Sequence, residues 1–421
     1  MRVVVVGLGY IGLPLAVAIA RAGVDAVGFD TDAARIGSIA AGRAATPGVD
    51  AAEVAALAKR GDLELGSEEK LLEGADVVVL AVPTPVFPDG APDRTHLDAA
   101  VASVLRFARK GMLVVLESTS PPGTTREIAA RFETAGFAVG TDLFVAHAPE
   151  RIDPGNARFT LETTPRIVGG VTPACTERAV AFYIQFVPAV RAVTDADTAE
   201  VVKLFENTFR AVNIGLVNEL ARAGSGLGVD VNEVLDAAAT KPFGFLKFTP
   251  GPGLGGPCIP AAARALAWKM KSVGADTSFE ALAEHANRAM PAYVTRLVEE
   301  ALGAAGKSIA GARILLCGMA YKPGVADVRG TPTLPIFDAL TARESHVFYM
   351  DSFVPVVRHG GRTLESLRPD TSFAGFDAVV IVTAHPDLDV ARLVGEAAIV
   401  VDTRNATAGH LSAASAAVVR L

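Results

Sequence analysis

Short apolar runs, each followed by a glycine-rich or polar loop, alternate with helical patterns over the first part of the chain. The runs are continuous rather than alternating, which is typical of strands buried on both faces of a parallel sheet. We expect strands at Val3–Val6, Val24–Phe29, Val77–Val82, Leu113–Leu116, Phe144–Ala148, Arg166–Gly170 and Val187–Val193. Strands that alternate with helices predict a doubly wound, Rossmann-like α/β domain over residues 1–194.

The pattern becomes helical from about Asp195. The segment Ala199–Arg222 contains no proline and is long enough for about six turns. Ala261–Val273 and Phe279–Leu302 are also helical in pattern. We therefore expect an all-helical middle segment over residues 195–302, and we expect these helices to form the interface of a homodimer.

A second α/β pattern opens at Arg313, where Ile314–Ala320 indicates a strand that runs into a turn. Further strands are expected at His346–Met350, Ala378–Val382 and Ala398–Val401. This half has no G-x-G-x-x-G motif, so it suits a different nucleotide or anion better than a second dinucleotide. The fold class is α/β, with two Rossmann-like doubly wound domains, at 1–194 and 303–421, joined by the helical segment.

Composition narrows the class of protein. The chain has 421 residues, half of them hydrophobic and a fifth charged, which predicts two or three compact domains with little disorder. A net charge of -7 argues against a nucleic-acid partner. Three widely separated cysteines fit a reducing cytoplasm without disulfides, and no cysteine–histidine spacing suggests a metal site. Glycines interrupt the apolar run after Arg2, so we expect neither a signal peptide nor a membrane span.

The strongest local motif is Gly7-Leu-Gly-Tyr-Ile-Gly12, which follows a predicted strand and opens a predicted helix. In this context the glycines make a tight turn, let a pyrophosphate approach the backbone and let helix and strand pack closely. Asp30 ends the next strand, where a carboxylate accepts the ribose hydroxyls and repels a 2′-phosphate, so NAD is favoured over NADP. The alternative is that the glycines only shape a turn. The candidate cofactor residues here are Gly7, Gly9, Tyr10, Ile11, Gly12, Asp30 and Arg35.

Polar residues follow three later strands. Thr84, Ser118 and Thr119 stand beyond strand ends, where ligands of an open parallel sheet collect, although each can equally be a helix cap or turn former. Glu150 also follows a strand, and it is either a base or the partner of Arg151.

Two further features point to covalent chemistry. Lys203 and Asn207 are four residues apart on one helix face, with Arg210 nearly in line, and can form an oxyanion site; the alternative is a solvated face with a Lys203–Glu206 pair. Cys258 ends the glycine- and proline-rich loop 249–260, which is suited to holding one side chain in place. The alternative there is a surface turn carrying a buried, inert thiol.

In combination, the motifs closely resemble the UDP-glucose/GDP-mannose dehydrogenase family over essentially the whole chain. They are Gly7–Gly12, Glu117–Thr119, Ala148–Arg151, Glu206–Asn213, Gly253–Cys258 and Ala320–Pro323. The segments Asn207–Arg210 and Gly251–Gly253 are similar to the bacterial branch that oxidises UDP-N-acetylhexosamines.

The resemblance implies that NAD accepts hydrides in a four-electron oxidation of a sugar C6 hydroxymethyl to a uronic acid. Cys258 would carry the thiohemiacetal and thioester, a thiolate being both a strong nucleophile and a good leaving group. Lys203 and Asn207 would hold the oxyanion, and Glu150 is a candidate base for hydrolysis. Thr84, Thr119 and Arg329 resemble further cofactor contacts. Contacts to the UDP-sugar would come from Arg151, Arg210, Phe248, Gly255, Lys322 and Arg404.

Two positions depart from the family pattern. Ala262 stands where the family usually has an aspartate four residues after the cysteine, and Pro257 stands where the related branch usually has histidine. Loss of the aspartate weakens the case for efficient thioester hydrolysis, and whether Glu150 or Asp153 compensates stays open. Two alternatives therefore remain: a relative that stops at the aldehyde or performs another two-electron oxidation, and a catalytically silent nucleotide-sugar-binding protein. The sequence leaves the sugar, the base and the pathway open.

Overall fold

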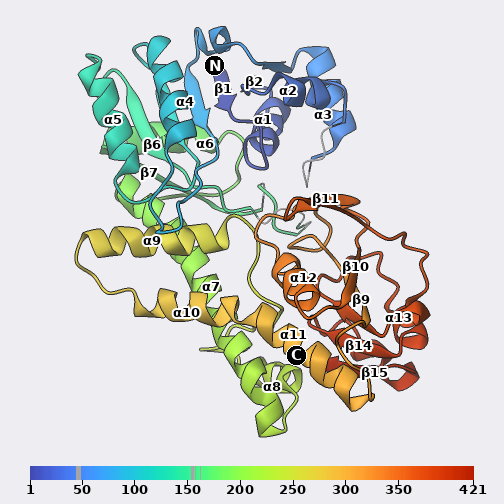
Figure 1. Cartoon of the computed structure of the whole chain (residues 1–421). Coiled ribbons are helices and arrows are strands. Elements are labelled where there is room, and N and C mark those ends of the chain that lie inside the picture. Colours follow the sequence, from blue (N-terminus) through green and yellow to red (C-terminus); the bar gives the residue numbers. More distant parts are fainter. Residues whose placement is uncertain (44–48, 153–155, 157, 162) are drawn as a thin grey trace. The chain divides into compact units, whose positions relative to one another are not determined.

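The computed structural model describes the chain except for residues 44–48, 153–155, 157 and 162 (Figure 1). The described residues form two compact units. The first comprises Met1–Glu206 with Ala261–Ala275, and the second comprises Asn207–Pro260 with Asp276–Leu421. The three-part division expected from the sequence remains a prediction.

The first unit contains a sheet of eight strands in its described part. The strands are β1 (Arg2–Val6), β2 (Asp25–Phe29), β3 (Leu63–Gly66), β4 (Val77–Leu80), β5 (Leu113–Leu116), β6 (Phe144–His147), β7 (Arg166–Gly170) and β8 (Val190–Ala192). Their order is β3-β2-β1-β4-β5-β6-β7-β8, and β7 runs antiparallel to β6. The strand order reverses at β1, which pairs with β2 on one side and β4 on the other. A doubly wound sheet binds ligands at such a point, beyond the carboxyl ends of its strands.

Helices cover both faces of this sheet. They are α1 (Gly12–Arg21), α2 (Ala33–Ala40), α3 (Ala51–Arg60), α4 (Thr95–Arg106), α5 (Thr124–Thr134) and α6 (Pro173–Tyr183), with a 3-10 turn, η1, at Glu69–Leu72. Successive side chains of a strand point to opposite faces. Val3 and Val5 of β1 accordingly pack with α1 and α6, whereas Val4 and Val6 pack with α4 and α5. The continuous apolar runs are thus explained by burial on both faces.

The middle of the chain is helical. It contains α7 (Ala196–Leu227), α8 (Val231–Ala238), α9 (Ile259–Ser272), α10 (Ser278–Arg288) and α11 (Met290–Ala304). The helical pattern over Phe279–Leu302 is divided in the structure, because α10 ends before Ala289 and α11 begins with Pro291 in its first turn. Proline has no backbone N–H to donate to the preceding turn, so it starts a new helix more readily than it continues one.

The second unit contains a parallel sheet ordered β10-β9-β13-β14-β15. The strands in this part of the chain are β9 (Arg313–Cys317), β10 (His346–Met350), β13 (Ala378–Ile381), β14 (Ile399–Asp402) and β15 (Ala417–Arg420), with a separate hairpin of β11 (Val356–His359) and β12 (Arg362–Glu365). Figure 1 shows α12 (Thr333–Thr341) and α13 (Val390–Glu396) on opposite sides of the sheet. Short 3-10 turns lie at Phe373–Gly375 (η2) and Ala408–Ala413 (η3). The expected fold class, two doubly wound α/β parts with a helical middle, is confirmed.

None of the helices formed by the described residues is long and apolar enough to cross a membrane. The apolar run that begins at Val3 divides into β1, the glycine turn and α1.

Candidate active site

The glycine motif forms the turn between β1 and α1. Gly7 has φ +92°, and a Cβ on it would lie 2.8 Å from the carbonyl oxygen of Ala81. A Cβ on Gly12 would lie only 1.9 Å from the carbonyl oxygen of Gly7. By contrast, apart from Gly9 and its two neighbours in the chain, no described atom lies within 4 Å of the position that a Cβ on Gly9 would take. The first and third glycines are therefore required by packing, and the second leaves open space for a ligand.

Asp30 lies beside this turn, at the end of β2. Its Oδ2 accepts a hydrogen bond from the backbone N–H of Leu8 (2.8 Å), and its Oδ1 accepts one from that of Asp32 (3.0 Å). Arg35 Nε lies 3.8 Å from Asp30 Oδ2. The carboxylate is thus held at the place where a dinucleotide's ribose hydroxyls bind, so the donor set fits NAD. Tyr10 is partly exposed on the same turn, and Ile11 packs against the core.

The loops after β4 and β5 are tied to each other. Thr84 Oγ1 donates to the carbonyl oxygen of Thr119 (2.6 Å), and Ser118 Oγ donates to that of Val82 (2.7 Å). The two strands are neighbours, so these loops lie at one carboxyl edge of the sheet. The structure thus brings the predicted residues Thr84 and Thr119 together.

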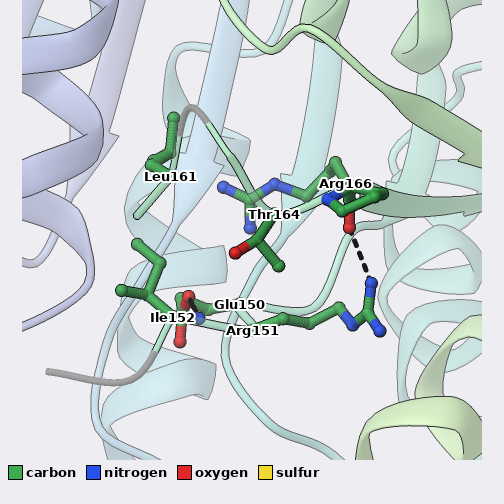
Figure 2. Close-up of a pocket in the computed structure, with 7 residues that line it drawn as sticks. Glu150, Arg151, Ile152, Leu161, Thr164 and Arg166 are labelled. Carbon is green, nitrogen blue, oxygen red and sulfur yellow. Dashed lines mark hydrogen bonds between the residues drawn. The ribbon is translucent and has the colours of Figure 1, made fainter. Parts of the chain in front are cut away.

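Glu150 follows β6 and is 7% exposed. It lines a pocket with about 190 Å³ of empty space, mouth included, together with Arg151, Ile152, Leu161, Thr164, Pro165 and Arg166 (Figure 2). Its Oε1 accepts a hydrogen bond from the backbone N–H of Ile152. Asp153, the other carboxylate considered from the sequence, lies outside the described residues.

Arg151 extends away from Glu150, and Figure 2 shows its hydrogen bond to the carbonyl oxygen of Pro165 (2.6 Å). Its guanidinium also binds both carboxylate oxygens of Glu206, with Nη2 2.6 Å from Oε1. The sequence left open a pair of Arg151 with Glu150, but the ion pair that the described structure gives Arg151 is with Glu206.

A buried polar group behind the pocket was missed by sequence reasoning. The Tyr183 hydroxyl donates to Glu117 Oε1 (2.5 Å), and Arg166 Nη2 lies 3.4 Å from the same oxygen. The Arg166 guanidinium also lies over the Tyr183 ring, 5.1 Å from its centroid. Burial raises the pKa of Glu117, although the Arg166 charge opposes this shift. Glu117 belongs to the motif Glu117–Thr119. The sequence of the strand before it does not indicate with which other residues its side chain packs.

Helix α7 is anchored by Glu200, which is fully buried. The Glu200 carboxylate accepts hydrogen bonds from the backbone N–H groups of Gly123 (2.7 Å) and Thr125 (2.8 Å) and from Thr125 Oγ1 (2.7 Å). These donors lie at the N-terminus of α5, a position that favours an acceptor oxygen. Burial nevertheless raises the pKa of Glu200 to about 7.

Glu200 fixes the helix face that carries the predicted oxyanion residues, because Glu200, Lys203 and Asn207 share one face by helical spacing. Asn207 is 9% exposed, and its Nδ2 has no hydrogen-bond partner among the residues that the structure describes. Arg210, one turn further on, is exposed.

The cysteine loop is held in the second unit by contacts that only glycine permits. Gly256 has φ +88° and donates to the carbonyl oxygen of Arg329 (3.0 Å). A Cβ on Gly256 would lie 2.8 Å from the ring of Tyr321, and one on Gly255 would lie 2.9 Å from Tyr321 Cβ. Cys258 is exposed at the end of this loop and forms no disulfide.

Arg404 lies against the start of the same loop. Its Nε donates to the carbonyl oxygen of Val382 (2.7 Å), and its Nη1 lies 2.6 Å from the position that a Cβ on Gly251 would occupy. Burial lowers the pKa of Arg404 to about 10. Arg404, the loop and Tyr321, the neighbour of Lys322, therefore come together in the second unit.

Two other predicted site residues, Arg329 and Phe248, contact side chains of the second unit. Arg329 Nη2 forms an ion pair with Asp327 Oδ2 (2.6 Å). Phe248 packs against the apolar cluster of α7 and α8, with its ring centroid 5.9 Å from that of Phe209.

Ala262 lies in α9 and is 2% exposed. It belongs to a small apolar cluster with Leu204, Ala265 and Leu266, against which Val86 and Met270 pack. The side chain at this position therefore faces an apolar environment.

Comparison with known proteins gives matches along the whole chain. The NAD binding, central and UDP binding domains of the UDP-glucose/GDP-mannose dehydrogenase family match residues 1–187, 197–289 and 315–409. A UDP-N-acetyl-D-mannosamine dehydrogenase of Pyrococcus horikoshii is 38% identical over 392 residues, which are 92% of this chain and 90% of the relative.

A UDP-N-acetyl-D-glucosamine 6-dehydrogenase of Pseudomonas aeruginosa is 32% identical over 392 residues, 92% of this chain and 91% of the relative. Among solved structures, a UDP-D-ManNAc dehydrogenase from Pyrococcus horikoshii superposes with a TM-score of 0.87 at 35% identity, covering 96% of each chain. The resemblance found in the sequence motifs, including the UDP-N-acetylhexosamine branch, is confirmed.

Proposed function

The chain belongs to the UDP-glucose/GDP-mannose dehydrogenase family and is an NAD-dependent nucleotide-sugar dehydrogenase; we propose that it oxidises the C6 hydroxymethyl of a UDP-N-acetylhexosamine to the uronic acid. Two relatives named for such sugars support this substrate class. NAD, when bound, accepts the hydride in each of the two oxidation steps.

Cys258 forms the covalent intermediate. Its thiolate attacks the sugar aldehyde, and protonation of the resulting oxyanion gives a thiohemiacetal. Loss of a hydride to NAD and of the hydroxyl proton to a base or water converts this adduct to a thioester. Water then adds to the thioester carbonyl carbon, the C–S bond breaks and the thiolate leaves. The observation that carries the proposal is the exposed thiol on a loop fixed by glycine contacts. Cys175 and Cys317 are buried, and burial raises the pKa of Cys317 to about 12, so neither is suited to this role.

Asn207 and Lys203 stabilise the oxyanion that develops on the sugar carbon. The Asn207 amide nitrogen supports this role, because a buried donor without a partner among the described residues is available to a ligand. Glu150 is the base for hydrolysis, and its position in a pocket at a strand end supports this assignment.

The substrate's UDP group is bound by the second unit. Arg404 and the loop of Lys322 lie against the glycine loop, and the two cations complement a diphosphate. We assign Gly255, Arg151, Arg210 and Phe248 to the rest of the substrate site, and Tyr10, Ile11, Arg35, Thr84, Thr119 and Arg329 to the cofactor site.

The enzyme acts as a homodimer through its middle helices. Large apolar side chains are exposed on this part of the second unit, among them Phe209 and Leu216 of α7, Phe279 and Leu282 of α10, and Phe243 of the loop after α8. Large apolar side chains exposed in this number support an interface. None of the three cysteines forms a disulfide, which supports a reducing compartment, so we place the enzyme in the cytoplasm.

A specific observation favours a second candidate. Ala262 replaces the family's aspartate with a side chain in an apolar cluster, which favours a relative that releases the aldehyde after one hydride transfer. The number of NADH molecules formed per sugar separates the two candidates.

The proposed function is tested by following NADH absorbance with UDP-glucose, UDP-N-acetylglucosamine, UDP-N-acetylmannosamine, UDP-N-acetylgalactosamine and GDP-mannose. We expect turnover with a UDP-N-acetylhexosamine, and no uronic acid after Cys258→Ala. Asn207→Ala should lower kcat about a hundredfold. Asn213→Ala is the matched control, because its amide donates to the backbone of Phe209. Full activity of Cys258→Ala would overturn the covalent mechanism.

A further inference from the structure

The segment 319–324, which follows β9, is held in the second unit by buried side chains of neighbouring loops. Asp351 follows β10, and its Oδ2 accepts hydrogen bonds from the backbone N–H groups of Met319 (2.6 Å) and Ala320 (2.8 Å). Thr383 follows β13, and its Oγ1 donates to the carbonyl oxygen of Ala320 (2.8 Å). The start of the segment is therefore fixed through its backbone.

His385 holds the other end of this segment. The backbone N–H of Gly324 donates a hydrogen bond to His385 Nδ1 (3.1 Å), and His385 Nε2 lies 2.9 Å from Asp351 Oδ2. The Phe353 ring stacks on the imidazole, with the centroids 4.7 Å apart and the planes inclined by 20°. The buried imidazole thus connects a buried carboxylate to the residue two positions after Lys322.

These two contacts determine which ring nitrogen of His385 carries the proton. A backbone N–H can only donate, so Nδ1, which faces Gly324, is without a proton. Burial raises the pKa of Asp351, but hydrogen bonds from His385 and from the backbone N–H of Ala320 outweigh this effect and lower it overall. Asp351 is therefore an ionised carboxylate that only accepts, and the proton of His385 lies on Nε2.

The loop after β13 supports Arg404 as well. Arg404 Nε donates to the carbonyl oxygen of Val382 (2.7 Å), which is the neighbour of Thr383 in the chain. The short stretch 382–385 therefore contacts both Arg404 and the segment that carries Lys322. Two cations that bind one diphosphate must keep a fixed spacing, and a common support provides it.

We propose that His385 is a positioning residue for the diphosphate of the UDP-sugar, because its hydrogen bond to Gly324 holds the backbone that presents Lys322 beside Arg404. The inference rests on the proposed function, which assigns these two cations to the UDP group. His385 acts through the backbone of the segment and not on the reacting carbon. A segment that is ordered before the ligand arrives lowers the entropy that binding costs, so His385 should affect affinity for UDP rather than hydride transfer.

His385→Gln and His385→Asn separate the two hydrogen bonds of the ring. Glutamine places its amide where Nε2 lies, so it keeps a donor for Asp351 and removes the acceptor for Gly324. Asparagine places an oxygen near the position of Nδ1 and restores that acceptor. We expect His385→Gln to bind UDP roughly three- to tenfold more weakly in calorimetry, the loss expected for one hydrogen bond, and His385→Asn to bind it more tightly than His385→Gln.

The kinetic constants show whether the effect is confined to the UDP group. In His385→Gln, KM for the UDP-sugar should rise by the same factor, while kcat and the Kd for NAD stay within about twofold of the wild-type values. The matched control is His359→Gln, because His359 of β11 also pairs its Nε2 with a carboxylate, that of Asp338 (2.8 Å). This variant should bind UDP as the wild type does.

An unchanged Kd for UDP in His385→Gln would overturn the inference, and so would a parallel loss of kcat and of NAD affinity, which indicates general damage to the fold. Failure of His385→Asn to improve on His385→Gln would also contradict it. Wild-type protein that binds no UDP would instead contradict the proposed function, and this inference with it.

A spectroscopic measurement tests the ring in the unaltered enzyme. In protein labelled with ¹⁵N-histidine, the His385 signals are those that disappear in His385→Gln or His385→Asn. Near neutral pH we expect an unprotonated Nδ1 and a protonated Nε2. A proton on Nδ1, whether in the other neutral tautomer or in a charged ring, would exclude the hydrogen bond from Gly324 and overturn the assignment.

Discussion

His147 ends β6 with its side chain completely buried and, within the described residues, with neither ring nitrogen hydrogen-bonded. Burial lowers the pKa of His147 to about 3, so the folded protein holds the ring neutral. The unfolded chain binds a proton at this residue near pH 6.5, and the folded chain does not. Stability from His147 is therefore complete above about pH 6.5 and is lost as the pH falls towards 3, by about 1.4 kcal/mol per pH unit.

Between pH 6 and pH 4.5, the wild-type protein should lose about 1.4 kcal/mol of unfolding free energy per pH unit because of His147. We predict that His147→Leu lacks this contribution, so that its urea midpoint changes less with pH than that of the wild type. The control is His96→Leu, an exposed histidine of α4. Equal pH dependence in wild type and His147→Leu would show that His147 is solvated or hydrogen-bonded.

Ala262 is the second residue whose environment makes a quantitative prediction. An aspartate there would place a carboxylate among Leu204 and Leu266. We expect Ala262→Asp to destabilise the protein by roughly 3 kcal/mol or more, the usual cost of an unpaired buried charge. Ala130→Asp, an exposed position in α5, corrects for helix propensity. Thermal unfolding compares the two variants, and an Ala262→Asp protein as stable as Ala130→Asp would contradict the apolar environment.

At the scale of elements, the cysteine loop depends on Gly256. Its φ of +88° is unfavourable for a side chain, and an added Cβ would collide with the Tyr321 ring at 2.8 Å. Gly256→Ala should therefore displace the loop at a cost of about 1–3 kcal/mol of backbone strain, before any steric term.

We expect Gly256→Ala to lower kcat at least tenfold while the far-UV spectrum stays unchanged. Gly303→Ala is the matched control, because Gly303 lies in α11 and, outside the adjoining residues and backbone of this helix, no described atom lies within 4 Å of the added methyl group. A Gly256→Ala enzyme with normal kcat would show that the loop tolerates displacement.

The helices and strands also show which parts of the fold can be predicted from the sequence. The continuous valine run of β1 and the glycine motif predicted strand, turn and helix, because local sterics and burial on both faces determine them. The strand β3, the hairpin of β11 and β12, and the edge strand β15 were missed. The residues of β3 and β15 are mostly only half-buried or exposed, so the hydrophobic pattern of the sequence does not mark these strands. They are defined by their pairing with a neighbouring strand.

The candidate site likewise contains some residues that the local sequence identifies and others that only the fold brings together. The motif residues Gly7, Asp30 and Cys258 could be singled out because each has a distinct local sequence context. The group of Glu117, Arg166 and Tyr183 could not, since its members come from β5, β7 and α6 and meet only through the fold. The same holds for Glu200, whose partners lie about 75 residues earlier in the chain.

At the scale of the whole molecule, the exposed apolar side chains of the middle helices predict association. Leu282 is 65% exposed on α10, in company with Phe279 at 78%. Leu282→Arg would place an unpaired charge in the proposed interface, so we predict a dimer for wild type and a shift to monomer for the variant in light scattering. Val356→Arg on the β11 hairpin, 52% exposed, is the control. A monomeric wild-type protein would remove the proposed interface.

The most direct test of the four-electron oxidation is the number of NADH molecules formed per sugar. A limiting, known amount of the UDP-N-acetylhexosamine that the enzyme uses is consumed completely in excess NAD, with the product identified by mass spectrometry. The covalent pathway through Cys258 predicts two NADH per sugar and a uronic acid. One NADH per sugar with release of an aldehyde would contradict it.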